Sequence, residues 1–306
     1  MMIEKRLFVL VFLISVTLSA QIKGVVVDEN NMPVPYVNIW FENGILVTTS
    51  EENGTFILEK KNQEKHLLFS VVGFETKKVE VAQAEKVVLK VASIQLDEVA
   101  IKRNYLKEKK EIGYYESSGF RYRMNYFVNA LYFNITEAER EQYPFIKEAK
   151  FKTVSKNKNA KIRMYLVEVN EDGSPSENML SDEVIFEVKK GNSKNTIDFS
   201  NQKIMVPEKG FFIVFEKLKI EQNKHYEEYA IRDKNGNKAK HKGMSYQPDI
   251  PLVAVKEAIG WNKHVNNKWE KSAKTMLQNP NSYENILMKK YHNKYLVPAV
   301  NITITN

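Results

Sequence analysis

Apolar and polar residues alternate with a period of two along much of this 306-residue chain, in short runs separated by turn-forming residues. Before residue 100 the runs include IKGVVVD, VPYVNIW, GTFIL, HLLFSVV and KVVLKV. Such alternation sends successive side chains to opposite faces of a strand, and Asn, Gly, Pro and Asp clusters between the runs are typical of β-sandwiches. No run in this region offers a start for a helix. The pattern therefore predicts an all-β fold.

Two turns help to order this first region. The prolines of DENNMPVP fix an extended entry into the next strand, and Asn53-Gly54 supplies the positive φ of a hairpin turn. Phe56, just after that turn, is expected to point into the sandwich. The other residues expected in this core are Val37, Ile39, Ile57, Leu68, Phe69, Val71, Val79, Val81, Val88 and Leu89.

The segments GVVVDENNMPVPYVNIWF, TTSEENGTFIL, LLFSVVGFETKKVEV, VVLKV and LDEVAI occur in this order. Together they resemble the carboxypeptidase regulatory-like domain, over residues 21–101. The resemblance implies a seven-stranded sandwich related to transthyretin. Ser50-Glu51-Glu52 stands where that family usually has an Asp in the turn, and Gly73-Phe74 replaces its usual Gly-Tyr.

In the family it resembles, this domain is not itself the peptidase. It accompanies a catalytic domain, or it precedes the plug and barrel of outer-membrane receptors. The residues after 101 are too few for a plug and such a barrel, which needs roughly ten residues per strand plus loops. The segment SIQLDEVAIKR, which ends the first module, must therefore lead into something else.

The charge of the chain changes sign near residue 100. Residues 21–100 contain 8 lysines and no arginine against 12 acidic residues, a net of −4, and residues 101–306 have a net of +11. This change supports a domain boundary. The basic residues are scattered lysines, which indicate a solvated face or attraction to an anionic envelope surface rather than to nucleic acid.

Alternation resumes after a charged connector, residues 102–119, which is expected to be a linker or an edge strand. From 120 to 306 the pattern predicts a second sandwich, similar to the jelly rolls of extracellular and carbohydrate-binding modules. A Val-Pro-x-x-Gly turn at 206–210 is expected to introduce one strand. The last strand is expected to place Val300, Ile302 and Ile304 on one face.

The region 221–293 is polar and shows turn signals at Asn235-Gly236 and Lys242-Gly243, so it is interpreted as loops. Aromatic side chains in or beside these loops are candidates for stacking on a sugar ring or for packing in the core. They are Tyr246, Trp261, Trp269 and Tyr283.

The first twenty residues have the layout of a secretory signal peptide: Lys5 and Arg6, an apolar run from Leu7 to Leu18, and Ser19-Ala20 before a cleavage site at Gln21. The run is shorter than the roughly twenty residues that cross a bilayer as a helix. The chain contains no cysteine, so it folds without disulfides and has no thiol for catalysis or lipid attachment. The sequence thus predicts export to the periplasm or to the outer membrane's vicinity.

Signatures of catalysis are weak. The chain has no Gly-x-Ser-x-Gly elbow and no phosphate-binding glycine loop. His225-Tyr226-Glu227-Glu228 matches the spacing of a zinc peptidase pair, but the surrounding segment is β-patterned and lacks that enzyme's glycine-rich strands. Asn170-Glu171-Asp172-Gly173 is interpreted as a turn in preference to a calcium loop.

We therefore expect a non-catalytic envelope protein, without a cofactor or metal, that binds a protein or glycan partner and no nucleic acid. The alternative is a hydrolase accessory or a degenerate peptidase or glycan-active enzyme. An exposed edge is expected to pair with a partner's sheet. Its residues are Leu96, Asp97, Glu98, Val99, Ala100 and Ile101.

Overall fold

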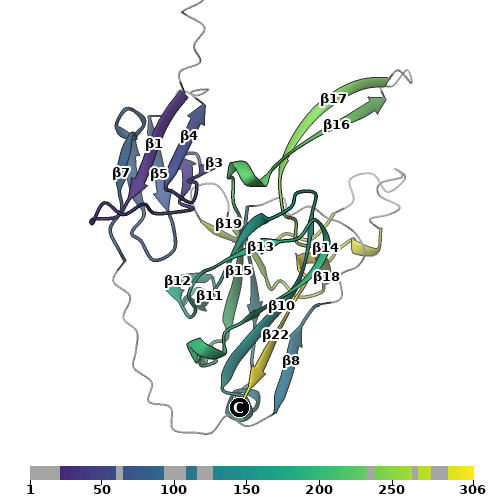
Figure 1. Cartoon of the computed structure of the whole chain (residues 1–306). Coiled ribbons are helices and arrows are strands. Elements are labelled where there is room, and N and C mark those ends of the chain that lie inside the picture. Colours follow the sequence, from purple (N-terminus) through teal and green to yellow (C-terminus); the bar gives the residue numbers. More distant parts are fainter. Residues whose placement is uncertain are drawn as a thin grey trace, which may run out of the picture.

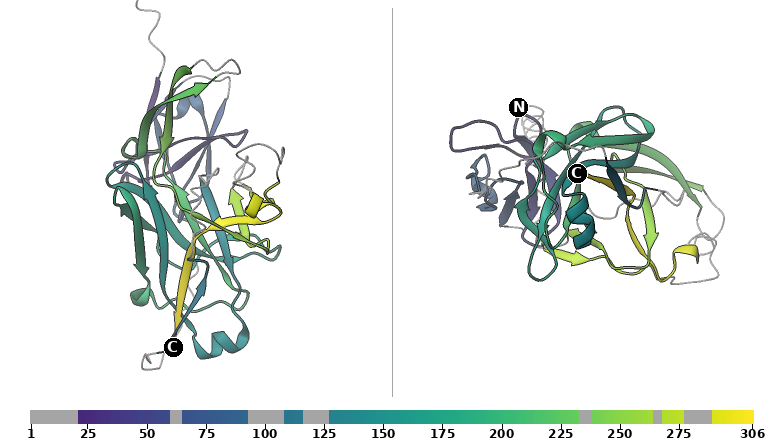
Figure 2. Two further views of the ribbon diagram at one scale, coloured as in Figure 1. Left: turned by 90° about the vertical axis from the view of Figure 1, so that its right-hand side faces the viewer. Right: turned by 90° about the horizontal axis from the view of Figure 1, so that it is seen from below.

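The computed structural model describes residues 21–59, 65–92, 108–115, 127–232, 238–263, 268–276 and 289–306. Its described residues are almost entirely β, as the alternation predicted, and form two sandwiches that lie side by side (Figures 1 and 2). None of the helices among these residues is long and apolar enough to span a membrane. The predicted signal peptide and the docking edge, Leu96 to Ile101, lie outside the described residues.

Among the described residues, the first sandwich has seven strands in two sheets. One sheet has the order β4-β1-β7, in which β1 pairs antiparallel with β4 and parallel with β7. Its strands are β1 (Gln21–Val27), β4 (Thr55–Glu59) and β7 (Lys86–Val88). The other sheet, β3-β2-β5-β6, is antiparallel and comprises β2 (Asn38–Phe41), β3 (Leu46–Thr49), β5 (His66–Ser70) and β6 (Lys77–Glu80). This arrangement confirms the predicted seven-stranded sandwich.

The core between these sheets contains most of the residues expected there, including Val37, Ile39, Phe69, Val71 and Leu89. Val79 and Val81 are partly buried against it, and Val88 is half-buried. Phe56 is buried as predicted.

Two of the expected core positions were wrong. Ile57 is 54% exposed, because Phe56 and Leu58 occupy the inward positions of β4 and successive side chains on a strand point to opposite faces. Leu68 alternates with Phe69 in the same way and packs in a different cluster, against the second sandwich.

The second sandwich consists of a smaller and a larger sheet. The four-stranded sheet β14-β10-β22-β8 is antiparallel and is built from β8 (Lys109–Gly113), β10 (Phe145–Ser155), β14 (Gly191–Asp198) and β22 (Val300–Thr305). The larger sheet has the order β12-β11-β15-β9-β19-β20, with β13 paired to β11. Its strands are β9 (Val128–Phe133), β11 (Ala160–Val169), β12 (Pro175–Met179), β13 (Val184–Val188), β15 (Phe211–Lys217), β19 (Gly260–Lys263) and β20 (Trp269–Lys271).

The core of this sandwich lies between the two sheets and includes Val300, Ile302 and Ile304 of β22, all fully buried, as the last alternating run predicted. Gly210 closes the Val-Pro-x-x-Gly turn with φ +75°, and its N–H donates to Pro207 O at 3.1 Å. β15 begins at the next residue, which confirms the predicted turn.

The segment predicted as a linker contains β8, an edge strand of the second sandwich, so the edge-strand alternative holds for Lys109–Gly113. Helix α2 (Glu137–Gln142) is one short turn of helix, which Thr136 and Glu139 start with a reciprocal capping box. Lys110 of β8 pairs with Glu139 at 2.7 Å. A separate two-stranded sheet is formed by β18 (Leu252–Val255) and β21 (Tyr295–Pro298).

The interpretation of the polar region after Glu221 as loops was partly wrong. Strands β16 (Lys224–Arg232) and β17 (Lys238–Tyr246) pair in regular antiparallel register as a hairpin, which projects at the end of the molecule opposite the C-terminus (Figures 1 and 2). Lys242-Gly243 is not a turn but lies within β17, opposite Glu228 and Glu227. Polar composition hid this hairpin, because neither of its faces is buried in a core.

Candidate functional site

The first candidate region is the junction of the two sandwiches, where sheet β3-β2-β5-β6 turns its second face toward the larger sheet. Trp40 and Leu46 pack there with Tyr165, Phe212 and Trp261 of the second sandwich. Trp40 is 3% exposed, and its indole N–H donates to Ser70 Oγ at 3.0 Å. The sheet is thus buried on both faces, once by its own core and once by its neighbour.

A fully buried guanidinium, that of Arg163 in β11, lies at the centre of this junction. Arg163 Nη1 donates to Glu216 Oε2 at 2.8 Å, and Nε lies 3.0 Å from Glu183 Oε2. Its Nη2 donates to the backbone oxygen of Tyr36 in the first sandwich, at 2.7 Å. One side chain therefore joins a buried carboxylate of its own sandwich to the backbone of the other.

Glu216 in β15 accepts two further hydrogen bonds, from Tyr165 Oη at 2.7 Å and from Asn38 Nδ2 of the first sandwich at 3.2 Å. Burial acts to raise the pKa of Glu216, but Arg163 and Tyr165 hold it below its ordinary value. Burial raises the pKa of Tyr165 well above its ordinary value, with Glu216 acting in the same direction. The contacts of Glu216 with Arg163, Tyr165 and Asn38 therefore hold the Arg163–Glu216 ion pair inside the junction.

Further polar contacts join the sandwiches around this centre. Lys161 Nζ donates to Tyr36 Oη at 2.9 Å and to Glu52 Oε2 at 3.1 Å. The N–H of Glu221 donates to Glu51 Oε1 at 2.9 Å. Glu51 and Glu52 belong to the turn at which this chain departs from the family it resembles, and both contact the second sandwich.

Lys219 follows β15 and reaches back to the first sandwich, where Nζ donates to the backbone oxygen of Leu46. Its ammonium also lies 4.4 Å from the ring centre of Phe127 and 5.9 Å from that of Tyr246. Burial lowers the pKa of Lys219 to about 8. Burial in the junction therefore disfavours the protonated form of Lys219.

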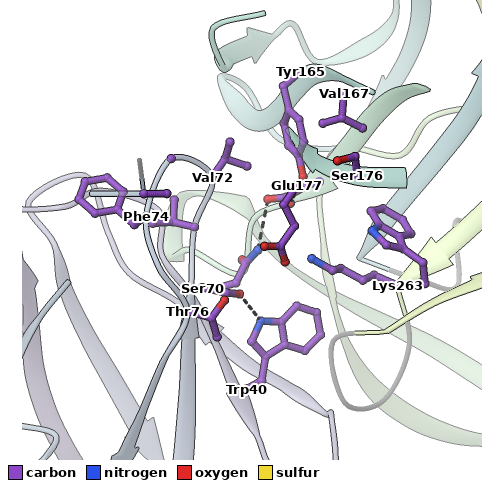
Figure 3. A pocket seen from close by; sticks show the side chains of 16 residues that line it. Trp40, Ser70, Val72, Phe74, Thr76, Tyr165, Val167, Ser176, Glu177 and Lys263 are labelled. Atoms are coloured by element: carbon purple, nitrogen blue, oxygen red, sulfur yellow. Dashed lines mark hydrogen bonds between the residues drawn. The ribbon is translucent and has the colours of Figure 1, made fainter. Parts of the chain in front are cut away.

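A pocket of about 100 Å³ opens between the sandwiches beside this polar centre. Figure 3 shows Trp40, Ser70 and Thr76 on the first-sandwich side, and Lys263 and Glu177 pointing into the space from the second. Val72 and Phe74, which follow β5, form an apolar part of the wall. Strands β2, β12 and β19 thus place polar and charged side chains around one small cavity.

Lys263 and Trp269 face each other across the β19–β20 pair, with Nζ 5.4 Å from the ring centre. Trp261 and Lys271 repeat this arrangement two residues away, also at 5.4 Å. Burial lowers the pKa of Lys263, while the carboxylates of Glu216 and Glu177 oppose that shift. Only the Lys263–Trp269 pair lines the pocket.

The aromatic residues singled out from the sequence do not gather at one site. Trp261 is 9% exposed in the junction cluster, and Trp269 is partly buried beside it. Tyr246, at the base of the hairpin, packs edge-on against Phe127 at 6.0 Å. Tyr283 lies outside the described residues. The sequence analysis missed Arg163, Lys263 and Glu177, since a single charged residue in a strand gives no signal that it lies in a junction or lines a pocket.

The second candidate region is the β16–β17 hairpin. Its base is held by the β10–β11 turn, where Asn157 Nδ2 donates to Lys224 O at 2.7 Å and His225 Nδ1 bonds with Asn157 Oδ1 at 2.9 Å. Beyond the base, Tyr226 and Met244 lie directly opposite each other and are 68% and 49% exposed. The hairpin therefore presents large apolar side chains to solvent.

The residues considered for metal chemistry have other partners. His225 bonds with Asn157, and Glu228 lies 3.6 Å from Lys242. Asp172 Oδ1 accepts from the N–H and hydroxyl of Ser174, as in a simple turn. Across the described ranges, no group of three or more His, Asp or Glu residues is placed to hold a metal ion.

The two-sheet sandwich of the first module is the part of the chain that matches a known family. The family model of the CarboxypepD_reg-like domain matches residues 22–101. That match supports the resemblance drawn from the sequence for this module. No curated protein matches the chain.

Proposed function

We propose that this chain is a non-catalytic docking protein of the Gram-negative cell envelope, exported by its N-terminal segment, which binds an envelope protein through the β16–β17 hairpin. The single observation that carries this proposal is the exposed pair Tyr226 and Met244 on a projecting two-stranded ribbon. The junction residues serve a different purpose in this proposal: they hold the two sandwiches as one body.

Physical reasoning favours a partner for the hairpin. A two-stranded hairpin alone is marginally stable in water, because it has no third surface on which to bury its side chains. Among the described residues, contacts of Asn157 and Lys156 with residues 224–227 hold the base of the hairpin. A protein surface laid against the exposed side chains would bury them, and large aromatic and Met side chains are enriched at such interfaces.

Charge points to an acidic partner surface. The register places Met244, Lys242 and Lys240 on one face of β17 together with Tyr226 of β16. Lys240 and Lys242 are exposed, and Glu228 is the carboxylate that lies beside Lys242. An acidic protein surface with an apolar centre matches this face. A glycan partner has less support, since Trp261 is buried and Tyr246 is packed against Phe127.

Site-specific cross-linking tests the proposal. A photoreactive amino acid at position 226 should cross-link one protein in stoichiometric amounts in intact envelopes, whereas the same group at Ile57 should not. Ile57 is the matched control, since it is comparably exposed but lies on the first sandwich. The purified partner should then bind the wild-type protein, lose affinity for Y226S/M244S by at least tenfold, and lose part of it at high salt.

Unchanged affinity of that partner for Y226S/M244S, or equal cross-linking from positions 226 and 57, would rule the hairpin out as the docking surface. A hydrolase accessory role, the alternative drawn from the sequence, would instead appear as altered activity of a co-purified enzyme.

A further inference from the structure

We propose that the pocket between the two sandwiches binds a small zwitterion of the α-amino-acid type, with Lys263 receiving its carboxylate and Glu177 its ammonium group. This site is separate from the hairpin and holds whether or not the hairpin docks on a protein.

Most polar groups around the pocket already have partners. The carboxylate of Glu216 bonds with Arg163, Tyr165 and Asn38, and the Trp40 indole bonds with Ser70. Lys263 and Glu177 differ from these: within the described part of the chain, neither has a hydrogen bond or an ion pair within 4.0 Å. Two opposite charges thus face one cavity without touching each other.

The balance of charge favours a ligand that is neutral overall but carries both signs. A simple anion would meet Lys263 but also the carboxylates of Glu216 and Glu177, and a simple cation would meet the ammonium of Lys263. A ligand with one carboxylate and one ammonium group forms a charge-assisted hydrogen bond with each unpaired side chain, and such bonds are roughly twice as strong as neutral ones.

Size and lining agree with this ligand. The cavity of about 100 Å³ far exceeds the roughly 10–15 Å³ that one water requires, yet it is small for a drug-sized molecule. Val72 and Phe74 provide an apolar wall for a side chain (Figure 3). The hydroxyl of Thr76 is a further polar group on the first-sandwich side.

Calorimetric titration of the purified protein with leucine, N-acetyl-leucine and leucinamide tests the assignment. Leucine should bind saturably, and each blocked analogue should bind at least about tenfold more weakly, because it lacks one charge-assisted bond. The variants should then distinguish the two ends: K263M should bind leucine and leucinamide equally, and E177Q should bind leucine and N-acetyl-leucine equally.

K271M is the matched control, since Lys271 makes the same contact with Trp261 outside the pocket and should leave leucine affinity unchanged. E177Q changes an exposed side chain, so the test survives if K263M fails to fold. No saturation by leucine at about 10 mM, equal affinity for blocked and free leucine, or a preference for glucose over leucine would each overturn the assignment.

Discussion

Replacing Arg163 by methionine should uncouple the two sandwiches and destabilise the protein by about 3–5 kcal/mol, the usual cost of removing one partner of a buried ion pair. Methionine fills much of the same space but leaves the Glu216 carboxylate, whose side chain is 5% exposed, without a cation. It also leaves the backbone oxygen of Tyr36 without the donor that lies 2.7 Å away. The loss should therefore fall on both sandwiches at once.

The difference in stability between R163M and the wild type should depend on pH. In the wild type, the pKa of Glu216 is held below its ordinary value, so its contribution to stability is present above the unfolded pKa and is lost as pH falls through the folded one. In R163M, burial without a cation should raise the folded pKa above the unfolded value. The variant should then gain stability relative to wild type as the pH falls through that raised pKa, since Glu216 becomes neutral.

Urea unfolding followed by tryptophan fluorescence measures the effect, since Trp40 and Trp261 both lie in the junction. The double variant R163M/E216Q provides the control: glutamine keeps an acceptor for Tyr165 but carries no charge, so it should recover more than about 1 kcal/mol of the loss. A loss below about 1 kcal/mol in R163M, or no recovery in the double variant, would show that Arg163 does not join the sandwiches as argued.

Three further predictions follow from single positions. The pKa of Lys219 is lowered to about 8 in the folded protein, so between that pKa and the ordinary pKa of lysine the unfolded state binds more protons than the folded state. The stability of the wild type should therefore rise as the pH rises above about 8. The unfolding midpoint of K219M should lack this rise. G210A should cost more than G173A in thermal unfolding, because both glycines have positive φ but only at Gly210 would the new Cβ lie 2.2 Å from a backbone oxygen; equal losses would contradict the clash. I39A should cost about 2–5 kcal/mol and I57S less than about 0.5 kcal/mol, and a comparable loss from I57S would mean that its side chain is buried after all.

The alternation of the first hundred residues was enough to predict an all-β sandwich, because turn residues and period-two runs report directly on strands with one buried face, and the expectation of seven strands came from the family resemblance. It failed at Ile57 of β4, which is exposed, and at Leu68 of β5, a strand buried on both faces: Phe69 packs in the sandwich core, whereas Leu68 packs against the neighbouring sandwich. Sequence alternation cannot say which buried face belongs to which core.

The candidate sites were less predictable than the fold. The hairpin was missed because exposed strands lack an apolar face. The pocket was missed because Lys263 and Glu177 lie 86 positions apart in the sequence and line one pocket only in the folded protein. The aromatic residues singled out from the sequence were expected to stack on a sugar or to pack in a core, and they gave no reason to expect Arg163 at the centre of a junction. A pattern along a single sequence does not predict which residues far apart in the chain come together in the fold.

The double burial of sheet β3-β2-β5-β6 bears on how such a protein can change by recombination. A regulatory-like sandwich from another protein, with a solvated outer face, would bring polar side chains to the positions of Trp40 and Leu46 and would not dock so as to bring the backbone oxygen at position 36 to Arg163. Exchange of the first module would then strand a buried guanidinium in the second. Replacement of the first module without matching changes in the second should therefore destabilise both halves of the chain.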